Sequence, residues 1–301
     1  MISPDSITFL VSSVLGLALA IPSNTCIVMG NLDIIRKKGK LSPSDVIFLG
    51  KGIVNILLQC LLSLEGMLYV LCRKVCYVTE VRGFMKTSGY FLAYYNFWLT
   101  FWLSAHYCTS ITNLSYGFFI WIKRIVSNFL SHLLFLTALG MFIVTVPGFW
   151  AVYGGSIPSS DNSTEDSGKT FHKMFSYFVP ANILGVFLPF CLSLLCLVFT
   201  FSFLLRHVWR VKNNDSGSTR PNLQAHVTAL RTIFFLLLIF TFFCVFQVID
   251  FLEISSLITV CWNLQLLSPS VEAAVILHAS NKLRMIILRR FWTRSQRNTE
   301  T

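Results

Sequence analysis

Two ionisable side chains lie deep inside long apolar stretches of the sequence, where a charge is costly. Lys51 lies in the second such stretch and Glu272 in the last one. A charged residue at the centre of a membrane helix costs roughly 2.5–3.5 kcal/mol, so each needs a partner. Lys51 lies about eight residues from the start of its segment, and Glu272 lies about nine from the end of its segment. If these two ends lie on the same side of the membrane, both side chains are about 12–14 Å deep at a helical rise of about 1.5 Å per residue. We therefore predict a buried ion pair, with Asn24 and Asn55 at a similar depth completing an intramembrane polar layer.

The sequence leaves a second reading of these charges open. Lys51 can extend its ammonium group to the membrane surface while Glu272 is protonated. A third carboxylate, Glu65, lies near the outer end of the second apolar stretch and is expected to be solvated.

Patterns typical of catalytic or metal sites are missing from the sequence. It contains no phosphate-binding G-x-x-x-x-G-K-[ST] loop, no G-x-S-x-G and no H-E-x-x-H. His106 has no second ligand at metal spacing and is expected to form hydrogen bonds within a helix bundle. We therefore expect no enzyme activity, no metal and no cofactor.

Three tryptophans are candidates for contact with a small molecule. Trp98 and Trp102 lie in the third apolar stretch and Trp262 in the last one. Each combines a large apolar face with an N–H group that needs an acceptor. The alternative for each is packing, or an anchor at the membrane interface, where Trp is enriched.

The composition predicts a membrane protein whose helices carry these residues. Among the 301 residues, 54% are hydrophobic and 12% are charged, whereas a soluble domain has about 25% charged residues. Seven segments are long and apolar enough to span a bilayer. They run roughly 6–32, 44–71, 87–115, 128–151, 175–209, 225–250 and 255–280. The prediction is an all-α bundle of seven transmembrane helices in a single domain covering 1–301.

The third segment, 87–115, is predicted to be the central helix. It contains no Asp, Glu, Lys or Arg, but polar or amphipathic side chains recur at every second position from Asn96 to His106. A step of two residues cannot keep them on one helical face. The segment must therefore contact other helices on several sides.

Basic residues predict the orientation of the chain. Most of the 24 Lys and Arg residues lie in the loops after the first, third and fifth segments and after the seventh. Because cytoplasmic loops carry the excess of basic residues, the N-terminus is expected outside and the C-terminus in the cytoplasm. The net charge of +11 then reflects contact with anionic lipid of the inner leaflet and not nucleic-acid binding.

The outer loops carry one glycosylation signal and two cysteines. Of the three Asn-x-Ser/Thr sequons, only Asn162 falls in a predicted outer loop, whereas Asn113 and Asn214 fall on the inner side. Cys72 and Cys76 flank a short loop and can form a disulfide or remain free thiols. Asn162 is therefore the predicted glycosylation site.

A short amphipathic helix is predicted after the seventh segment. In N-K-L-R-M-I-I-L-R-R-F-W, at 281–292, apolar and basic side chains fall largely on separate faces. Such a helix lies along the inner leaflet.

Several motifs resemble those of the type 2 bitter taste receptors. L-R-H at 205–207, followed by G-S-T-R-P-N-L-Q-A-H-V-T-A-L-R-T at 217–232, is similar to their signature between the fifth and sixth helices. Further similarities, in chain order, are Asn24, L-S-P-S-D at 41–45, F-I-W-I-K-R-I at 119–125, L-P-F at 188–190 and S-N-K-L-R at 280–284. They cover the whole chain.

The chain departs from the family pattern at buried polar positions. Asn55 replaces a family Arg, Ser110 a Lys, and Glu272 a His. These departures indicate a divergent, non-mammalian member, in which the Lys51–Glu272 pair substitutes for the usual contacts. Vomeronasal type 1 pheromone receptors are the nearest alternative, and a non-signalling membrane transporter is a more distant one.

The resemblance implies a chemosensory G-protein-coupled receptor of the plasma membrane. Small, mostly apolar bitter agonists would bind between helices three, five, six and seven, and a gustducin-type heterotrimeric G protein would bind at the inner ends. By position, the implied ligand pocket is Asn96, Trp98, Trp102, Asn182, Phe243, Gln247, Trp262 and Gln265. The implied G-protein-facing residues are Lys123, Arg124, Arg206, His207 and Lys212.

Overall fold

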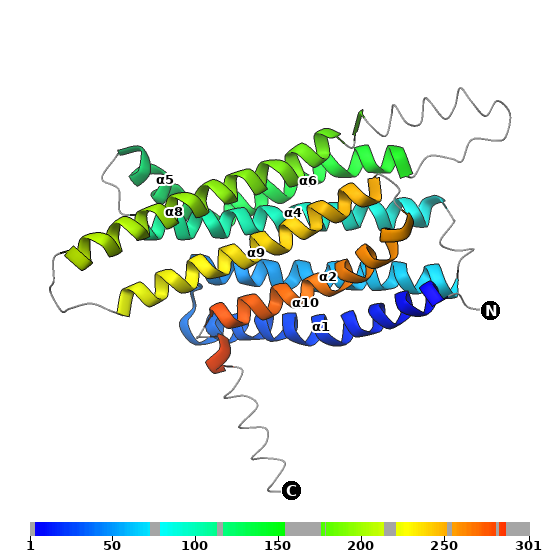
Figure 1. Ribbon diagram of the computed structural model, residues 1–301, viewed down its shortest axis with the longest axis horizontal. Coiled ribbons are helices and arrows are strands. Elements are labelled where there is room, and N and C mark those ends of the chain that lie inside the picture. Colours follow the sequence, from blue (N-terminus) through cyan, green and yellow to red (C-terminus); the bar gives the residue numbers. More distant parts are fainter. Residues whose placement is uncertain are drawn as a thin grey trace, which may run out of the picture.

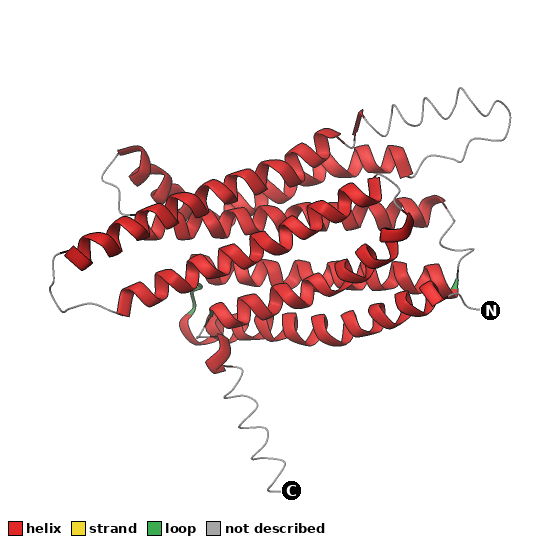
Figure 2. Cartoon of the chain, viewed as in Figure 1, coloured by secondary structure: helices red, strands yellow, loops and turns green. Residues whose placement is uncertain are grey.

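The structure, a computed structural model, is built from long helices that run side by side (Figures 1 and 2). It describes residues 4–72, 79–112, 117–153, 176–177, 179–213, 221–251, 255–280 and 283–286. The elements are α1 (Pro4–Lys38), α2 (Pro43–Leu71), α4 (Thr79–Ile111), α5 (Gly117–Asn128), α6 (Leu130–Tyr153), η1 (Ile183–Phe187), α8 (Leu188–Asn213), α9 (Pro221–Phe251) and α10 (Ser255–Ala279). Within these ranges the regular structure is all helical, which confirms the predicted fold class.

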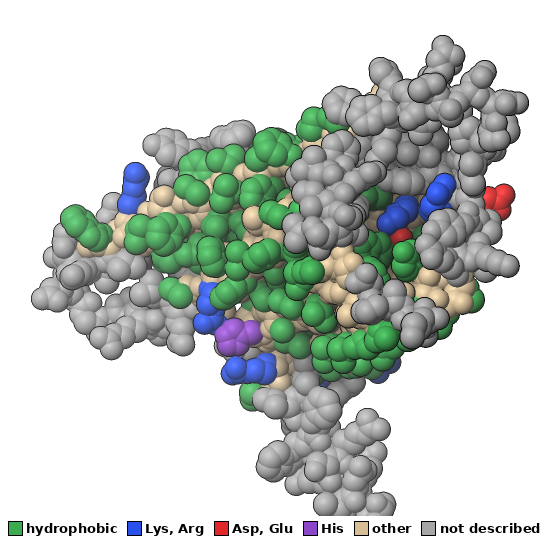
Figure 3. Space-filling view, turned by 45° about the vertical axis from the view of Figure 1, so that its right-hand side comes forward, with side chains coloured by type: hydrophobic (Ala, Val, Ile, Leu, Met, Phe, Trp, Pro, Cys, Tyr) green, Lys and Arg blue, Asp and Glu red, His purple; other side chains and the backbone are tan. Residues whose placement is uncertain are grey.

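The long helices have the dimensions of membrane spans. Within the described ranges, α1, α2, α6, α8, α9 and α10 contain stretches long and apolar enough to cross a bilayer. The seventh long helix, α4, carries recurring polar side chains, and its described residues contain no such stretch. Figure 3 shows hydrophobic side chains over the middle of one face and Lys and Arg side chains towards its two ends.

Helix α4 is the centre of the bundle, as predicted. It contacts α2, α6, α8 and α9, and also the short elements α5 and η1. The helices α1, α2 and α10 pack together on one side of the bundle, and α9 joins α10 to α8. The polar side chains on several faces of α4 therefore meet different neighbours.

Local sequence explains the turn between α1 and α2. Gly39 follows α1 with a positive φ of 64°, which glycine adopts without strain. Ser42 then caps α2 by accepting a hydrogen bond from the backbone N–H of Asp45 at 3.3 Å. Pro43 occupies the first helical position, where its missing N–H costs nothing.

A π-helical turn, η1, precedes Pro189 at the start of α8. The backbone N–H of Leu188 bonds to the carbonyl of Ile183, five residues back. Pro189 has no N–H and its ring displaces the carbonyl of Gly185, which favours an irregular turn here. A Cβ added to Gly185 would lie 2.5 Å from ring atoms of Tyr94, so η1 and α4 pack closely only because this residue is glycine.

The segment after α10 packs against α1. Residues 283–286 are helical, and Leu283 is fully buried against Gly30. The rest of the predicted amphipathic helix lies outside the described residues. The predicted segments leave 116–127 as an inner loop, but most of this stretch lies in the separate helix α5.

Candidate functional site

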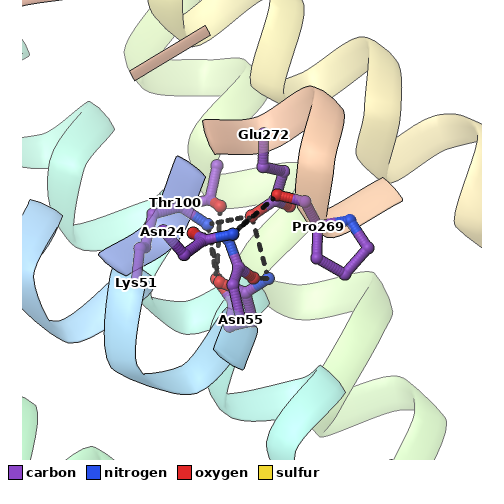
Figure 4. A network of polar contacts seen from close by, with 7 residues as sticks. Asn24, Lys51, Asn55, Thr100, Pro269 and Glu272 are labelled. Atoms are coloured by element: carbon purple, nitrogen blue, oxygen red, sulfur yellow. Dashed lines mark hydrogen bonds and ion pairs between the residues drawn. The ribbon is translucent and has the colours of Figure 1, made fainter. Parts of the chain in front are cut away.

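Lys51 of α2 and Glu272 of α10 form a buried ion pair at the centre of the bundle (Figure 4). Lys51 Nζ lies 3.2 Å from Glu272 Oε2. Lys51 is fully buried and Glu272 is 6% exposed. The pairing that the sequence predicted is therefore present, and Lys51 does not extend to the surface.

Three asparagines complete the shell around this pair. Glu272 Oε2 accepts hydrogen bonds from Asn55 Nδ2 at 3.1 Å and from Asn96 Nδ2 at 3.0 Å, in addition to Lys51 Nζ. Lys51 Nζ also donates to Asn96 Oδ1 at 2.7 Å. Asn55 Nδ2 donates to Asn24 Oδ1 at 3.3 Å. We call these five residues the polar layer; each buried charge within it is met by several polar atoms.

The polar layer joins four helices. Asn24 comes from α1, Lys51 and Asn55 from α2, Asn96 from α4 and Glu272 from α10. Asn24 Nδ2 also donates to the carbonyl of Pro269 in α10, at 3.1 Å. The network can therefore hold the four helices in one relative arrangement.

Asn96 was predicted to line the ligand pocket, but the structure places it in the polar layer. Its side-chain oxygen accepts from Lys51, and its amide nitrogen donates to Asn55 and Glu272. The residue is 4% exposed. The predicted bounds place Asn96 in the outer half of segment 87–115 and Lys51 near the inner end of segment 44–71, so depth gave no signal for this placement.

A small cavity lies among α2, α4, α9 and α10. We call it the outer cavity; its volume is about 60 Å³. Its lining includes three residues predicted to contact ligand, namely Phe243, Trp262 and Gln265. The other lining residues are Leu58, Leu62, Glu65, Met85, Lys86, Gly89, Tyr90 and Ala93.

One ion pair supplies the charged groups of the outer cavity. Lys86 Nζ lies 2.9 Å from Glu65 Oε1 and 4.8 Å from the centroid of the Trp262 ring. The Lys86 side chain is 28% exposed and that of Glu65 is 16% exposed. The expectation that Glu65 is simply solvated was wrong, because Lys86 on the adjacent helix covers it. Sequence reasoning missed this pair, although its opposite charges near the outer ends of α2 and α4 were a usable signal.

Other predicted pocket residues contact neighbouring helices. Trp98 Nε1 donates to the carbonyl of Leu184 at 3.1 Å, and Trp102 Nε1 donates to Thr137 Oγ1 on α6 at 3.0 Å. Asn182 Oδ1 accepts from the hydroxyl of Tyr94 at 3.0 Å. These three residues do not line the outer cavity. The side chain of Gln247 lies outside the described residues, and ligand contact remains a prediction for all of them.

At the inner end, three of the predicted G-protein-facing residues are exposed. Lys123 and Arg124 lie on α5 and Arg206 lies on α8. The side chains of His207 and Lys212 are outside the described part of the chain, as are residues Asn162 and Cys76. Among the residues that the structure describes, no cluster of His, Cys, Asp or Glu could hold a metal ion.

Comparison with known proteins identifies the family. The model of the family described as "Taste receptor protein (TAS2R)" matches residues 1–295. The chain belongs to this taste receptor family. Its relatives include taste receptor type 2 member 40 of Gallus gallus, which is 26% identical over 91% of this chain and 90% of the relative. Member 41 of Rattus norvegicus is 28% identical over 97% and 99% of the two chains.

Membership establishes the general activity of the protein. The chain is a multi-pass membrane protein and a chemosensory G-protein-coupled receptor of the bitter taste type. Receptors of this family bind ligands and couple to G proteins. The family resemblance predicted from the motifs is confirmed, and no finding favours the vomeronasal or transporter alternatives.

Proposed function

We propose that this receptor binds small, mostly apolar bitter compounds in the outer cavity and transmits binding through α10 to a gustducin-type G protein. It acts in the plasma membrane with its N-terminus outside, its C-terminus in the cytoplasm and a glycan on Asn162. The observation that carries the proposal is the shared helix: α10 supplies both Trp262 and Gln265 to the cavity and Glu272 to the polar layer.

The chemistry of the outer cavity suits this class of ligand. Most of its walls are apolar or aromatic, and its polar groups are the Lys86–Glu65 pair, the hydroxyl of Tyr90 and the amide of Gln265. Ligand sites typically combine apolar walls with a few polar groups that fix orientation. Varied small compounds can therefore be held by shape and by one or two hydrogen bonds.

The small volume of the outer cavity links binding to a change of shape. Pockets for drug-sized ligands measure roughly 300–1,000 Å³, far more than the cavity of about 60 Å³ seen here. A ligand of that size must bind an arrangement in which the surrounding helices have separated. An agonist shifts a receptor only by binding one state better than the other, and this cavity provides that difference.

Separation of the helices around the outer cavity would be transmitted through the polar layer to the cytoplasmic ends of the helices. Moving α10 at Trp262 and Gln265 displaces Glu272 on the same helix, with the helix-distorting Pro269 between them. At the inner end, Arg231 on α9 lies 2.6 Å from His278 Nε2 on α10. Rearranging these contacts would change the surface on which Lys123, Arg124, Arg206, His207 and Lys212 meet the G protein.

The test is a calcium assay in cells that express the receptor with a promiscuous G protein. We expect responses to apolar bitter compounds, and Trp262→Leu should lower potency at least tenfold with unchanged surface amount. Phe135→Leu is the control, because Phe135 is 68% exposed on α6 and does not line the outer cavity. Absence of any response across a broad panel, with the receptor at the surface, would contradict the proposal.

The orientation is tested separately with epitope tags. A tag at the N-terminus should be accessible to antibody on intact cells, and a tag at the C-terminus only after permeabilisation. Antibody binding to the C-terminal tag on intact cells would contradict the proposed orientation. It would also contradict the proposed G-protein-facing surface.

A further inference from the structure

A second, larger hollow opens on the outside of the bundle between α9 and α10. We call it the α9–α10 groove; it measures about 350 Å³. Its rim is formed by side chains exposed on the helix surfaces, including Phe242 (55%), Leu264 (46%) and Val271 (48%). Because these helices span the membrane, a hollow on their outer surface faces lipid. The polar side chains in its lining are those of Gln265 and Ser268.

The groove and the outer cavity share part of their walls. Phe243 of α9 and Gln265 of α10 line both hollows, one on the lipid side and the other inside the bundle. Both residues are partly buried. Phe243 packs edge-on against Phe97 of α4, with ring centroids 4.9 Å apart. Where the two hollows meet, these two side chains therefore separate the lipid from the candidate ligand site.

We propose that the α9–α10 groove is the lateral entrance through which apolar agonists dissolved in the membrane reach the outer cavity, with Phe243 and Gln265 as the gate. The proposal rests on the proposed function, since it assumes that agonists occupy the outer cavity. The occupant is a compound with a largely apolar body and one hydrogen-bonding group. Ser268 can meet that group in the groove, and Gln265 can meet it on passage into the cavity.

Partitioning makes this route favourable for apolar compounds. Each methylene that enters hydrocarbon gains enough free energy to raise the concentration in the membrane about fourfold. An apolar agonist is therefore concentrated beside the groove and dilute in the outer solution. A polar agonist is not, and it would enter at the outer end, where Lys86 is partly exposed.

The experiment fills the groove without touching the gate. Leu264→Trp and Val271→Trp add bulk at two exposed positions of the rim, so neither needs the core to repack. Val245→Trp is the matched control, because Val245 is 47% exposed on α9 and does not line the groove. Surface amount and thermal stability identify any variant that fails to fold; the other rim variant then provides the test.

The first measurement needs no agonist. Purified receptor in phosphatidylcholine nanodiscs is mixed with a trifluoromethyl phenyl diazirine, an apolar photolabel that dissolves in the membrane, and is flashed after delays from milliseconds to minutes. Mass spectrometry then quantifies label on Met85 and Leu62, which line the outer cavity but not the groove. We expect this labelling to appear at least fivefold more slowly in both rim variants, to reach the same final level, and to be unchanged in Val245→Trp.

Two results would contradict the proposal that the α9–α10 groove is an entrance. One is labelling of Met85 and Leu62 at the original rate in both rim variants. The other is absence of that labelling in the unmodified receptor while groove residues are labelled. Because the readout is chemical labelling, these failures are distinct from failure of the calcium assay, which would instead contradict the proposed function.

A second measurement uses agonists found in the calcium screen. A rim variant should slow the onset and the washout of an apolar agonist by similar factors, since a route affects entry and exit alike. A polar agonist should keep its original kinetics. Equal slowing of both agonists would contradict a separate lateral route.

Discussion

The polar layer and the outer cavity share the helices α2, α4 and α10 but are built in opposite ways. In the layer, Lys51 is fully buried and Glu272 nearly so, and Asn55 and Asn96 complete their hydrogen bonding. In the cavity, the Lys86–Glu65 pair is partly exposed and borders unfilled space. The difference suggests that the layer determines which arrangement of helices is stable, whereas the cavity is free to change its contacts when a ligand arrives.

The strongest test of this contrast reverses the charges of the buried pair. Lys51→Glu or Glu272→Lys alone places two like charges together without solvent, and breaking a buried pair costs about 3–5 kcal/mol. Each single variant should lose most of its surface expression, measured by flow cytometry with an N-terminal tag. The double variant should recover part of it, because amide groups can turn to suit the reversed pair.

Recovery in the double variant should be incomplete. Lys51 Nζ also lies 3.3 Å from the backbone carbonyl of Asn96, which would repel a carboxylate at that position. If the double variant is no better than the single ones, direct pairing is not what stabilises the layer.

Asn96→Ala tests whether Asn96 belongs to the layer or to the ligand pocket. It removes hydrogen bonds to both buried charges, and such bonds contribute about 1.5–3 kcal/mol each. The purified receptor in detergent should unfold at a clearly lower temperature. Ser110→Ala, at an exposed position of the same helix, is the control. If thermal stability is unchanged and agonist potency shifts, Asn96 contacts the ligand and does not stabilise the polar layer.

Trp98→Phe should have a smaller effect on stability. It keeps an aromatic ring facing Phe101, whose centroid lies 5.5 Å away, but loses the N–H that bonds to the carbonyl of Leu184. A neutral hydrogen bond contributes about 0.5–1.5 kcal/mol, so a modest fall in melting temperature is expected. A large loss of agonist potency at normal stability would instead show that Trp98 contacts ligand.

Lys86→Met should affect stability least and signalling more. A partly exposed ion pair contributes about 1 kcal/mol or less, so melting temperature should hardly change. Agonists that bond to the ammonium group should lose roughly tenfold in potency, equivalent to about 1.4 kcal/mol. Lys40→Met, at an exposed position between α1 and α2, provides the control. A stability loss as large as that of Asn96→Ala would remove the contrast between the two regions.

The sequence allowed the depth of residues to be predicted better than their direction. Lys51 and Glu272 could be paired because position along a membrane helix converts directly into depth. Asn96 and Trp102 were assigned to the pocket by their positions in the family pattern, but α4 has polar side chains on several faces. Which face meets which neighbour depends on helix rotation, and that is fixed by packing between distant segments.

Two further features of the site escaped prediction for different reasons. The Lys86–Glu65 pair joins residues near the outer ends of two helices, where charged side chains are usually solvated. The π-helical turn at 183–187 precedes Pro189 and packs against Tyr94 at Gly185. A hydrophobic pattern alone does not reveal such an irregularity, since a π turn and an α turn share the same apolar composition.

The π turn also has a consequence for the register of the fifth membrane helix. Such a turn holds one residue more than an α turn, so deleting one residue from 183–187 could leave a regular helix. A π turn and an α turn each complete about one full rotation, so the segments before and after the deletion would keep their orientations. Asn182 would still face Tyr94. A single-residue insertion or deletion is therefore absorbed at this turn, and both halves of the helix keep their neighbours.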